Sequence, residues 1–512
     1  MKTTQKTRKA SRFDGQTMKR LLRYVMQNYK FRFLFVFAFI TLSAVASVVG
    51  SLFLKTLIDD YIAPLLLEAN PVFDRLLGAI LVMAAIYLVG VISTLLYNRM
   101  MVSVAQGTLK KIRDEMFAHM QTLPLSYFDT HSHGDVMSCY TNDTDALRDM
   151  ISQSIPQVFS SVVTIVAVLA AMCYTSWILT LLVVGYSVVL IVVTGRIGGS
   201  SSRYFMKQQM SLGDVNGYVE EIINGQKVVK VFNYEARAAK IFDEKNETLF
   251  KNANAANKFA NILMPILNNM GHLLYVMVAV LGGTLALNGI GGLTLGSIAA
   301  FLQLSRSFTQ PISQVSQQIN SIVMALAGAK RIFALMDEAP EADDGDVTLA
   351  YAEPNGESWV LTDKKTNHWV WKVPQPDGTC RLVPLKGDVR FCDVNFRYEA
   401  KKPILKHVDL YAEQGQKVAF VGSTGAGKTT ITNLINRFYD VTDGSITYDG
   451  IDVRRIKKAD LRRSLGMVLQ DTNLFTGSVK DNIRYGRLDA TDDEIVAAAK
   501  LANADGFIRM LP

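Results

Sequence analysis

Residues 422–429 read Gly-Ser-Thr-Gly-Ala-Gly-Lys-Thr, and this stretch decides the fold of the chain around it. It fits the pattern G-x-x-x-x-G-K-[ST] of a phosphate-binding loop. Glycines let backbone N–H groups close around phosphate oxygens, and a helix that starts after the loop adds positive partial charge. The residues that we expect to bind the phosphates are Gly422, Ser423, Thr424, Gly425, Ala426, Gly427, Lys428 and Thr429.

The segments on both sides of this loop have the character that the motif needs. Val418–Val421 is apolar and predicts a buried strand, and Thr430–Phe438 carries apolar residues at helical spacing. In such a strand–loop–helix unit the Lys428 amine reaches the β- and γ-phosphates, and the Thr429 hydroxyl can ligate Mg²⁺. The sequence therefore predicts nucleotide binding, against the alternative of a Gly-rich turn that matches by chance.

The distribution of charge points to a membrane rather than to nucleic acid. The 512 residues are 49% hydrophobic with a net charge of +8, and the apolar residues are crowded before about residue 325. Ten basic residues lie among the first 32, against the single acid Asp14, directly before a long apolar run. This placement is the positive-inside pattern of membrane proteins, so we expect no nucleic-acid partner. The cysteines have no metal-type or disulfide-type spacing, and we expect reduced thiols at Cys139, Cys173, Cys380 and Cys392.

The apolar region divides into segments of the length that crosses a bilayer. Each has about the 20 residues that a helix needs to span the hydrocarbon core. They lie near 32–54, 76–98, 156–176, 178–198, 262–287 and 295–318. Within residues 1–31, the stretch 16–28 places apolar residues on one helical face and predicts an amphipathic helix at the cytoplasmic interface. The sequence thus predicts a six-helix transmembrane domain over 32–325, with both of its ends in the cytoplasm.

The loops on the cytoplasmic side are long and polar with helical periodicity, and they span 99–155 and 199–261. Each is interrupted near its middle, at Pro124–His131 in the first and at Asn224–Tyr234 in the second. We expect a short transverse helix at each interruption, in contact with a cytosolic domain.

The sixth apolar segment is polar on one side. Arg306 lies near its centre and Pro311 can kink it. An intramembrane charge is costly and usually faces a cavity or the bundle interior, so we predict that this side lines a cavity, with a polar helix–helix contact as the alternative. In the fifth segment Asn268 and Asn269 are weaker candidates, and we expect His272 to be packed and neutral. The polar residues of the sixth segment are Gln303, Ser307, Gln310, Gln314 and Gln317.

A linker over 326–346 turns acidic near its end and precedes an unusual segment over 347–386. In that segment 358–361 and 368–371 alternate like strands, and we predict a hairpin insertion that is a packed β addition or a binding surface. Residues 387–512 predict a soluble α/β domain. Its expected strands are 389–396, 403–410, 418–421, 446–449 and 466–470, with a short helix over 461–465.

Taken together, these features resemble a half-transporter of the ATP-binding cassette (ABC) exporter family, multidrug type. The resemblance covers most of the chain apart from 347–386. It is strongest in Val394-Asn-Phe-Arg-Tyr398, in Val421–Thr430 and in Val468–Phe475. The implied fold class is multi-domain, with a six-helix α transmembrane domain followed by an α/β P-loop NTPase domain that is incomplete at its C-terminus.

The resemblance assigns further roles by position. Tyr398 stands where the family has an aromatic residue that stacks on adenine. Gln470 stands where the family has a glutamine that contacts Mg²⁺ and the membrane domain, and Thr430 adjoins the phosphate loop. Pro124–His131 and Gln226–Tyr234 stand where the family has its coupling helices.

The chain also departs from the family. After the phosphate loop we find no Leu-Ser-Gly-Gly-Gln-like signature, no strand ending in Asp-Glu and no switch histidine; His407 precedes the loop and cannot fill that place. The sequence is therefore expected to be truncated within the nucleotide-binding domain and to hold no catalytic residue, with Gln470 as an accessory. As given, it would bind ATP weakly and not hydrolyse it.

For the complete protein, the resemblance implies ATP-driven export of amphipathic small molecules such as drugs across the cytoplasmic membrane. The implied cofactors are ATP and Mg²⁺. The implied partners are membrane lipid, the substrate and a second half-transporter subunit, identical or different, with a heterodimer favoured. Alternatives are an exporter of lipid or peptide and, in another class, a nucleotide-gated channel or regulator on the same scaffold.

Overall fold

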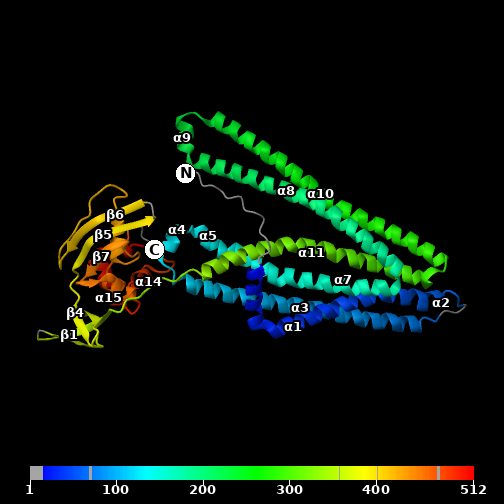
Figure 1. Cartoon of the computed structure of the whole chain (residues 1–512), viewed down its shortest axis with the longest axis horizontal. Coiled ribbons are helices and arrows are strands. Elements are labelled where there is room, and N and C mark those ends of the chain that lie inside the picture. The colour runs from blue at the N-terminus through cyan, green and yellow to red at the C-terminus, as the bar shows by residue number, and fades with distance from the viewer. Residues whose placement is uncertain (1–14, 69–71, 357, 400–401, 470–472, 512) are drawn as a thin grey trace. The chain divides into compact units, whose positions relative to one another are not determined.

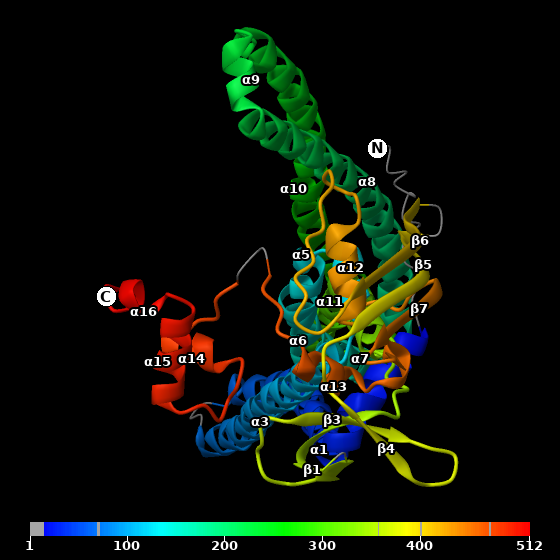
Figure 2. The ribbon, with the colours of Figure 1, turned by 90° about the vertical axis from the view of Figure 1, so that its left-hand side faces the viewer.

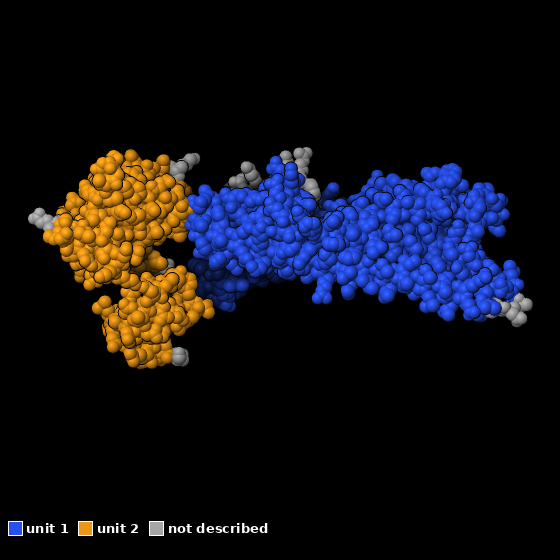
Figure 3. Space-filling model, turned by 90° about the horizontal axis from the view of Figure 1, so that it is seen from below, with its two compact units in different colours: residues 1–123, 130–340 blue, residues 124–129, 341–512 orange. Residues whose placement is uncertain are grey.

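The computed structural model describes residues 15–68, 72–356, 358–399, 402–469 and 473–511. These residues form two compact units, which Figure 3 colours separately. Unit 1 comprises the described residues of 1–123 and 130–340, and unit 2 comprises 124–129 together with the described residues of 341–512.

Unit 1 is built from long helices. Among the described residues, six helical stretches are long and apolar enough to cross a membrane, as the sequence predicts. The long helices are α1 (Gly15–Thr56), α3 (Asp74–Met120), α7 (Ile155–Thr175), α8 (Trp177–Asn224), α10 (Glu235–Leu287) and α11 (Leu295–Met336). Shorter turns extend or connect them: η1 (Leu57–Ile62), α2 (Ala63–Leu65), α5 (His133–Ser138), η2 (Cys139–Asp143), α6 (Thr144–Asp149), η3 (Met150–Ser154), α9 (Gln226–Val231) and η4 (Ile290–Gly292).

Helices α8 and α10 pair with each other along their length. Toward the short helix α9 that joins them they run apart from the other helices of this unit, whereas at their other ends α8 contacts α7 and α10 contacts α11 (Figures 1 and 2). Helix α9 is the short helix that was expected within the predicted interruption at 224–234. The remaining helices pack more closely, with α1 against α3 and α11 against both α7 and α1.

Helix α1 is bent where the predicted amphipathic helix ends. Tyr29 has a non-helical φ of −132°, and this kink separates the first turns from the membrane-spanning part. The predicted apolar face consists of Met18, Leu21, Leu22 and Val25. Leu21 and Val25 are buried within the protein, and Met18 and Leu22 are partly exposed. Packing between helices therefore covers part of the face that was expected to meet the lipid surface.

The polar side of α11 is also divided. Gln314 accepts a hydrogen bond from Gln157 on α7. This residue therefore makes the polar helix–helix contact that was the alternative to lining a cavity. Arg306 and Gln310, by contrast, line a cavity of about 480 Å³ between α8, α10 and α11. His272 lines the same cavity with an exposed side chain, so the prediction of a packed residue was wrong. Hydropathy could not distinguish these outcomes, because it does not say which face of a helix meets a neighbour.

Unit 2 contains two antiparallel sheets among its described residues. The first has the order β2-β1-β3-β4 and the second β6-β5-β7-β8. Figure 2 labels β1, β3 and β4 of the first sheet and β5, β6 and β7 of the second. The strands are β1 (Thr348–Asn355), β2 (Ser358–Leu361), β3 (Trp369–Pro374), β4 (Cys380–Pro384), β5 (Val389–Glu399), β6 (Lys402–Ala412), β7 (Asp443–Tyr448) and β8 (Ile451–Asp452). The helical elements are α4 (Leu125–Thr130, of which 125–129 belong to this unit), α12 (Lys428–Ile435), η5 (Val453–Arg455), α13 (Lys458–Ser464), α14 (Val479–Arg484), α15 (Asp492–Leu501) and α16 (Asp505–Ile508).

The segment 347–386 is a packed β addition, but it is not the predicted hairpin. β2 and β3 lie on opposite sides of β1 and pair with it rather than with each other. Trp371 of β3 is fully buried in a hydrophobic cluster that it shares with Phe391 of β5 and Ile446 of β7. The two sheets therefore share one core.

Two other predicted strands are not formed. Residues 418–421 and 466–469 have no strand conformation, and Val421 and Val468 are 94% and 97% exposed. Such apolar strands need a neighbour on each side of a sheet, and the described residues place no strand beside them.

Candidate functional site

The phosphate loop is closed by two glycines in left-handed conformation. Gly425 has φ +86° and Gly427, directly before α12, has φ +94°. A Cβ on Gly427 would lie 2.7 Å from Leu405 Cδ2, so both the backbone conformation and the packing against β6 require glycine there. The loop therefore brings its backbone to the start of a helix, where N–H groups without helical partners can bind an anion.

The Lys428 side chain folds back over this loop. Its Nζ donates hydrogen bonds to the carbonyl oxygens of Gly422, at 2.7 Å, and of Ser423, at 2.9 Å. The amine is thus held at the loop with a third donor left for phosphate oxygens. Thr429 is exposed on the first turn of α12, where its hydroxyl can act as a ligand to a metal ion. The other loop residues, Thr424 and Ala426, are exposed as well.

Tyr398 lies beside α12 at the end of β5. It is 45% exposed, its hydroxyl donates to Thr430 Oγ1 at 3.3 Å, and its ring meets the Tyr439 ring edge to face at 4.9 Å between centroids. Thr430 is buried and accepts this hydrogen bond, and its part in nucleotide binding stays a prediction. Adenine stacking on Tyr398 stays a prediction. Gln470 lies outside the described residues.

A contact that the sequence did not predict at the residue level joins Tyr439 to Asp129. The Tyr439 hydroxyl donates to the Asp129 carboxylate within unit 2. Burial, this hydrogen bond and the carboxylate charge raise the pKa of the Tyr439 phenol above its usual range, so the phenol remains a donor. Asp129 belongs to α4, the short helix within the predicted interruption 124–131, so the position of that interruption was the only signal for this contact.

A further ion-pair cluster fixes the start of unit 2. The Glu341 carboxylate accepts hydrogen bonds from Arg462, at 2.6 Å, and from Lys458, at 3.1 Å. Burial opposes ionisation of this carboxyl, but the two cations outweigh it and lower its pKa. The end of the linker is thereby held on α13.

The fold and the site define a membrane protein with a nucleotide-binding domain on the same chain, and comparison with known families agrees. The family model "ABC transporter transmembrane region" matches residues 33–312, and the model "ABC transporter" matches residues 405–510. The chain belongs to the ABC transporters.

The chain is also similar to individual ABC transporters over most of its length. The chain is 36% identical to an uncharacterized ABC transporter ATP-binding protein, YfiC, of Bacillus subtilis (strain 168), over 97% of this chain and 76% of the relative. It is 30% identical to an ATP-dependent lipid A-core flippase of Desulfotalea psychrophila, over 98% of this chain and 80% of the relative.

A third relative is a fatty acid ABC transporter ATP-binding/permease protein of Mycobacterium tuberculosis. It is 36% identical over 84% of this chain, and the aligned region spans 62% of its own length. The chain is thus a half-transporter of the exporter type, a multi-pass protein of the cell membrane whose nucleotide-binding domain is cytoplasmic. Its family couples ATP hydrolysis to transport.

Proposed function

We propose that this chain is one subunit of a dimeric exporter that uses ATP to move amphipathic small molecules, drugs among them, across the cytoplasmic membrane. The second subunit is an identical or related half-transporter, with a heterodimer favoured. Residues 32–325 form the transport pathway and 387–512 belong to the nucleotide-binding domain, which the segment 347–386 extends.

One observation carries this proposal. Residues 124–129 come from a loop between two membrane-spanning helices, yet they belong to the same compact unit as the phosphate loop. The bond from Tyr439 to Asp129 ties this segment to the nucleotide-binding fold. A change in that fold on ATP binding therefore pulls directly on a loop of the membrane domain, and the substrate acts through its different affinity for the two resulting states.

The residues have separate roles in this proposal. Lys428 and the loop N–H groups bind the phosphates, Tyr398 holds the adenine, and Gln470 reports on the γ-phosphate side. Thr429 and Gln470 would hold Mg²⁺, which neutralises charge on the phosphate oxygens when bound. The exposed Thr429 hydroxyl fits a hard cation, and the described residues contain no cluster of metal ligands that would hold the ion without the nucleotide.

Transport is tested with the complete subunit and its natural partner in lipid vesicles. We expect efflux of an amphipathic dye that requires ATP and is not supported by a non-hydrolysable analogue. Currents far above transporter rates in single-channel recording, with no ATP-driven efflux, would instead favour the nucleotide-gated channel.

A second candidate, export of lipid, is supported by the printed names of two relatives, which refer to a fatty acid and to lipid A-core. Stimulation of ATP hydrolysis by lipids but not by drugs would favour it over the first.

The hydrogen bond from Tyr439 to Asp129 gives a prediction about the coupling of ATP hydrolysis to transport. Tyr439→Phe removes the donor to Asp129 and keeps the ring. A hydrogen bond to a charged group contributes about 1.5–3 kcal/mol, so we expect transport to fall about tenfold while ATP hydrolysis stays within about twofold. Efflux and ATPase rates measured on the same vesicles check this. Tyr411→Phe, an exposed tyrosine on β6, is the matched control, and equal losses in both variants would contradict the assignment.

A further inference from the structure

The predicted membrane spans of this chain are unbalanced in charge. No Asp or Glu occurs within 32–54, 76–98, 156–176, 178–198, 262–287 or 295–318. Arg306 nevertheless lies in the middle of the last span. At 1.5 Å per residue it is about 16 Å from residue 295 and about 18 Å from residue 318, close to the centre of a hydrocarbon core of about 30 Å. None of these six predicted spans contains a carboxylate that could neutralise it.

The structure shows where this charge is directed. Arg306 is exposed to the cavity between α8, α10 and α11, and its guanidinium carbon lies 5.2 Å from the centre of the Tyr275 ring. Among the described residues Arg306 forms no ion pair, so a cation–π contact is its charge-stabilising partner. Such a contact is weaker than a hydrogen-bonded ion pair and leaves the guanidinium N–H groups available.

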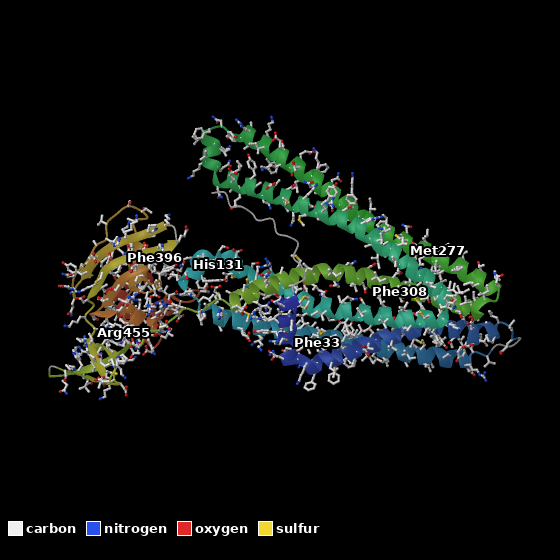
Figure 4. The ribbon with its side chains drawn as sticks, viewed as in Figure 1. Phe33, His131, Met277, Phe308, Phe396 and Arg455 are labelled. Carbon is white, nitrogen blue, oxygen red and sulfur yellow. The ribbon has the colours of Figure 1, made fainter. Side chains whose placement is uncertain are left out.

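Other hydrogen-bonding side chains surround the same space at a similar depth. His272 is about 15 Å from the cytoplasmic end of its span, and Asn268 lies one turn from it on α10. Gln310 lies one turn from Arg306 on α11. Three leucines add apolar surface to the lining, Leu190, Leu267 and Leu274, and the remaining lining residues are Gly271, Ser305, Thr309, Ser313 and Gln317. Figure 4 shows the neighbouring helices through two labelled residues, Met277 on α10 and Phe308 on α11.

We propose that this cavity binds an anionic amphiphile, a molecule with a carboxylate or phosphate group on an apolar body. Arg306 supplies the opposing charge through its forked N–H groups, and His272, Asn268 and Gln310 supply further hydrogen bonds. The leucines contact the apolar body. This inference rests on the proposed transport function and specifies its substrate class, because a cationic drug would meet an unneutralised arginine at the centre of the membrane.

Binding is measured without ATP, so that the result does not depend on export. Three fluorescent probes with the same alkyl chain, bearing a carboxylate, a phosphate or a trimethylammonium group, are titrated into the complete transporter in detergent. We expect tighter binding of the anionic probes, with the ratio of carboxylate to phosphate affinity identifying the preferred headgroup. Arg306→Gln is expected to weaken anionic binding about tenfold to 100-fold and to leave cationic binding unchanged or improved.

Two further variants test whether the effect of Arg306→Gln comes from the lost charge in the cavity rather than from misfolding. Arg196→Gln removes an exposed arginine of α8 outside the cavity lining and should change neither affinity. A Cβ on Gly271 would meet no atom within 4 Å, so Gly271→Leu should extend into the cavity and weaken binding of every probe. Equal effects of Arg306→Gln on anionic and cationic probes, or no effect, would overturn the inference.

ATP-driven efflux of the same probes distinguishes the two proposals. Charge-selective binding that Arg306→Gln abolishes, without any efflux, supports the site and contradicts the transport function. Efflux accompanied by binding that ignores charge contradicts the site and leaves the transport function standing.

Discussion

Replacing Trp371 with alanine is expected to destabilise unit 2 by about 3–5 kcal/mol, the usual cost of deleting a large buried aromatic side chain. Trp371 is fully buried, and its ring packs edge to face against Tyr448 at 5.6 Å between centroids. Its indole N–H also donates to Asp449 Oδ2 at 2.9 Å. Because the residue joins the core that the two sheets share, its loss should loosen β5 and β7 as well as β3.

The measurement is hydrogen exchange of the β5 and β7 amides in the complete protein, since unfolding of a multi-domain membrane protein gives no single free energy. Trp371→Phe keeps most of the ring and should cost clearly less. Trp359→Ala, on β2 outside this core, is the matched control with a small expected effect. Unchanged exchange in β5 and β7 of the Trp371→Ala variant would mean that the β addition folds independently.

Replacing Lys428 with alanine is expected to lower ATP turnover by a factor of roughly 100 to 1000, the usual loss when one preorganised donor to developing charge is removed. The amine is held at the loop by its bonds to Gly422 and Ser423 and is the cation placed there to meet the β- and γ-phosphates. Transport driven by this site should fall with it.

The assay is phosphate release and dye efflux by the complete transporter in vesicles, with the nucleotide site of the partner subunit already inactivated. Lys417→Ala removes an exposed lysine from the same unit without touching the loop and should leave both rates unchanged. Efflux that persists in Lys428→Ala at the wild-type rate would contradict the role of this site as the energy source.

The sequence was sufficient for features that local composition determines. Apolar runs of about 20 residues predict spans whatever their neighbours are, and the phosphate loop depends on its own glycines. The strands at 418–421 and 466–470 were different, because an apolar run forms a strand only when another strand pairs with it. The predicted hairpin at 347–386 failed for a related reason: β1 was not recognised, and it takes the place between β2 and β3.

At the candidate site, the phosphate-loop residues could be predicted from the sequence, whereas the tertiary contacts around them could not. The contact of Tyr439 with Asp129 joins residues that are 310 positions apart, and no local periodicity encodes such a pair. The polar side of α11 shows the same limit, since Gln314 meets Gln157 while Gln310 lines the cavity. Which partner each side chain has is a property of the packed helices.

The kink at Tyr29 has a consequence for motion. On the N-terminal side of this kink, the Arg20 guanidinium binds the Asp337 carboxylate at 2.5 Å and lies 4.1 Å from the centre of the Phe333 ring. The first turns of α1 are thus anchored at the C-terminal end of α11 and joined to their own spanning helix through the kink at Tyr29. We therefore expect a tilt of α11 to move the first turns of α1 with it, because the ion pair between Arg20 and Asp337 connects the two helices.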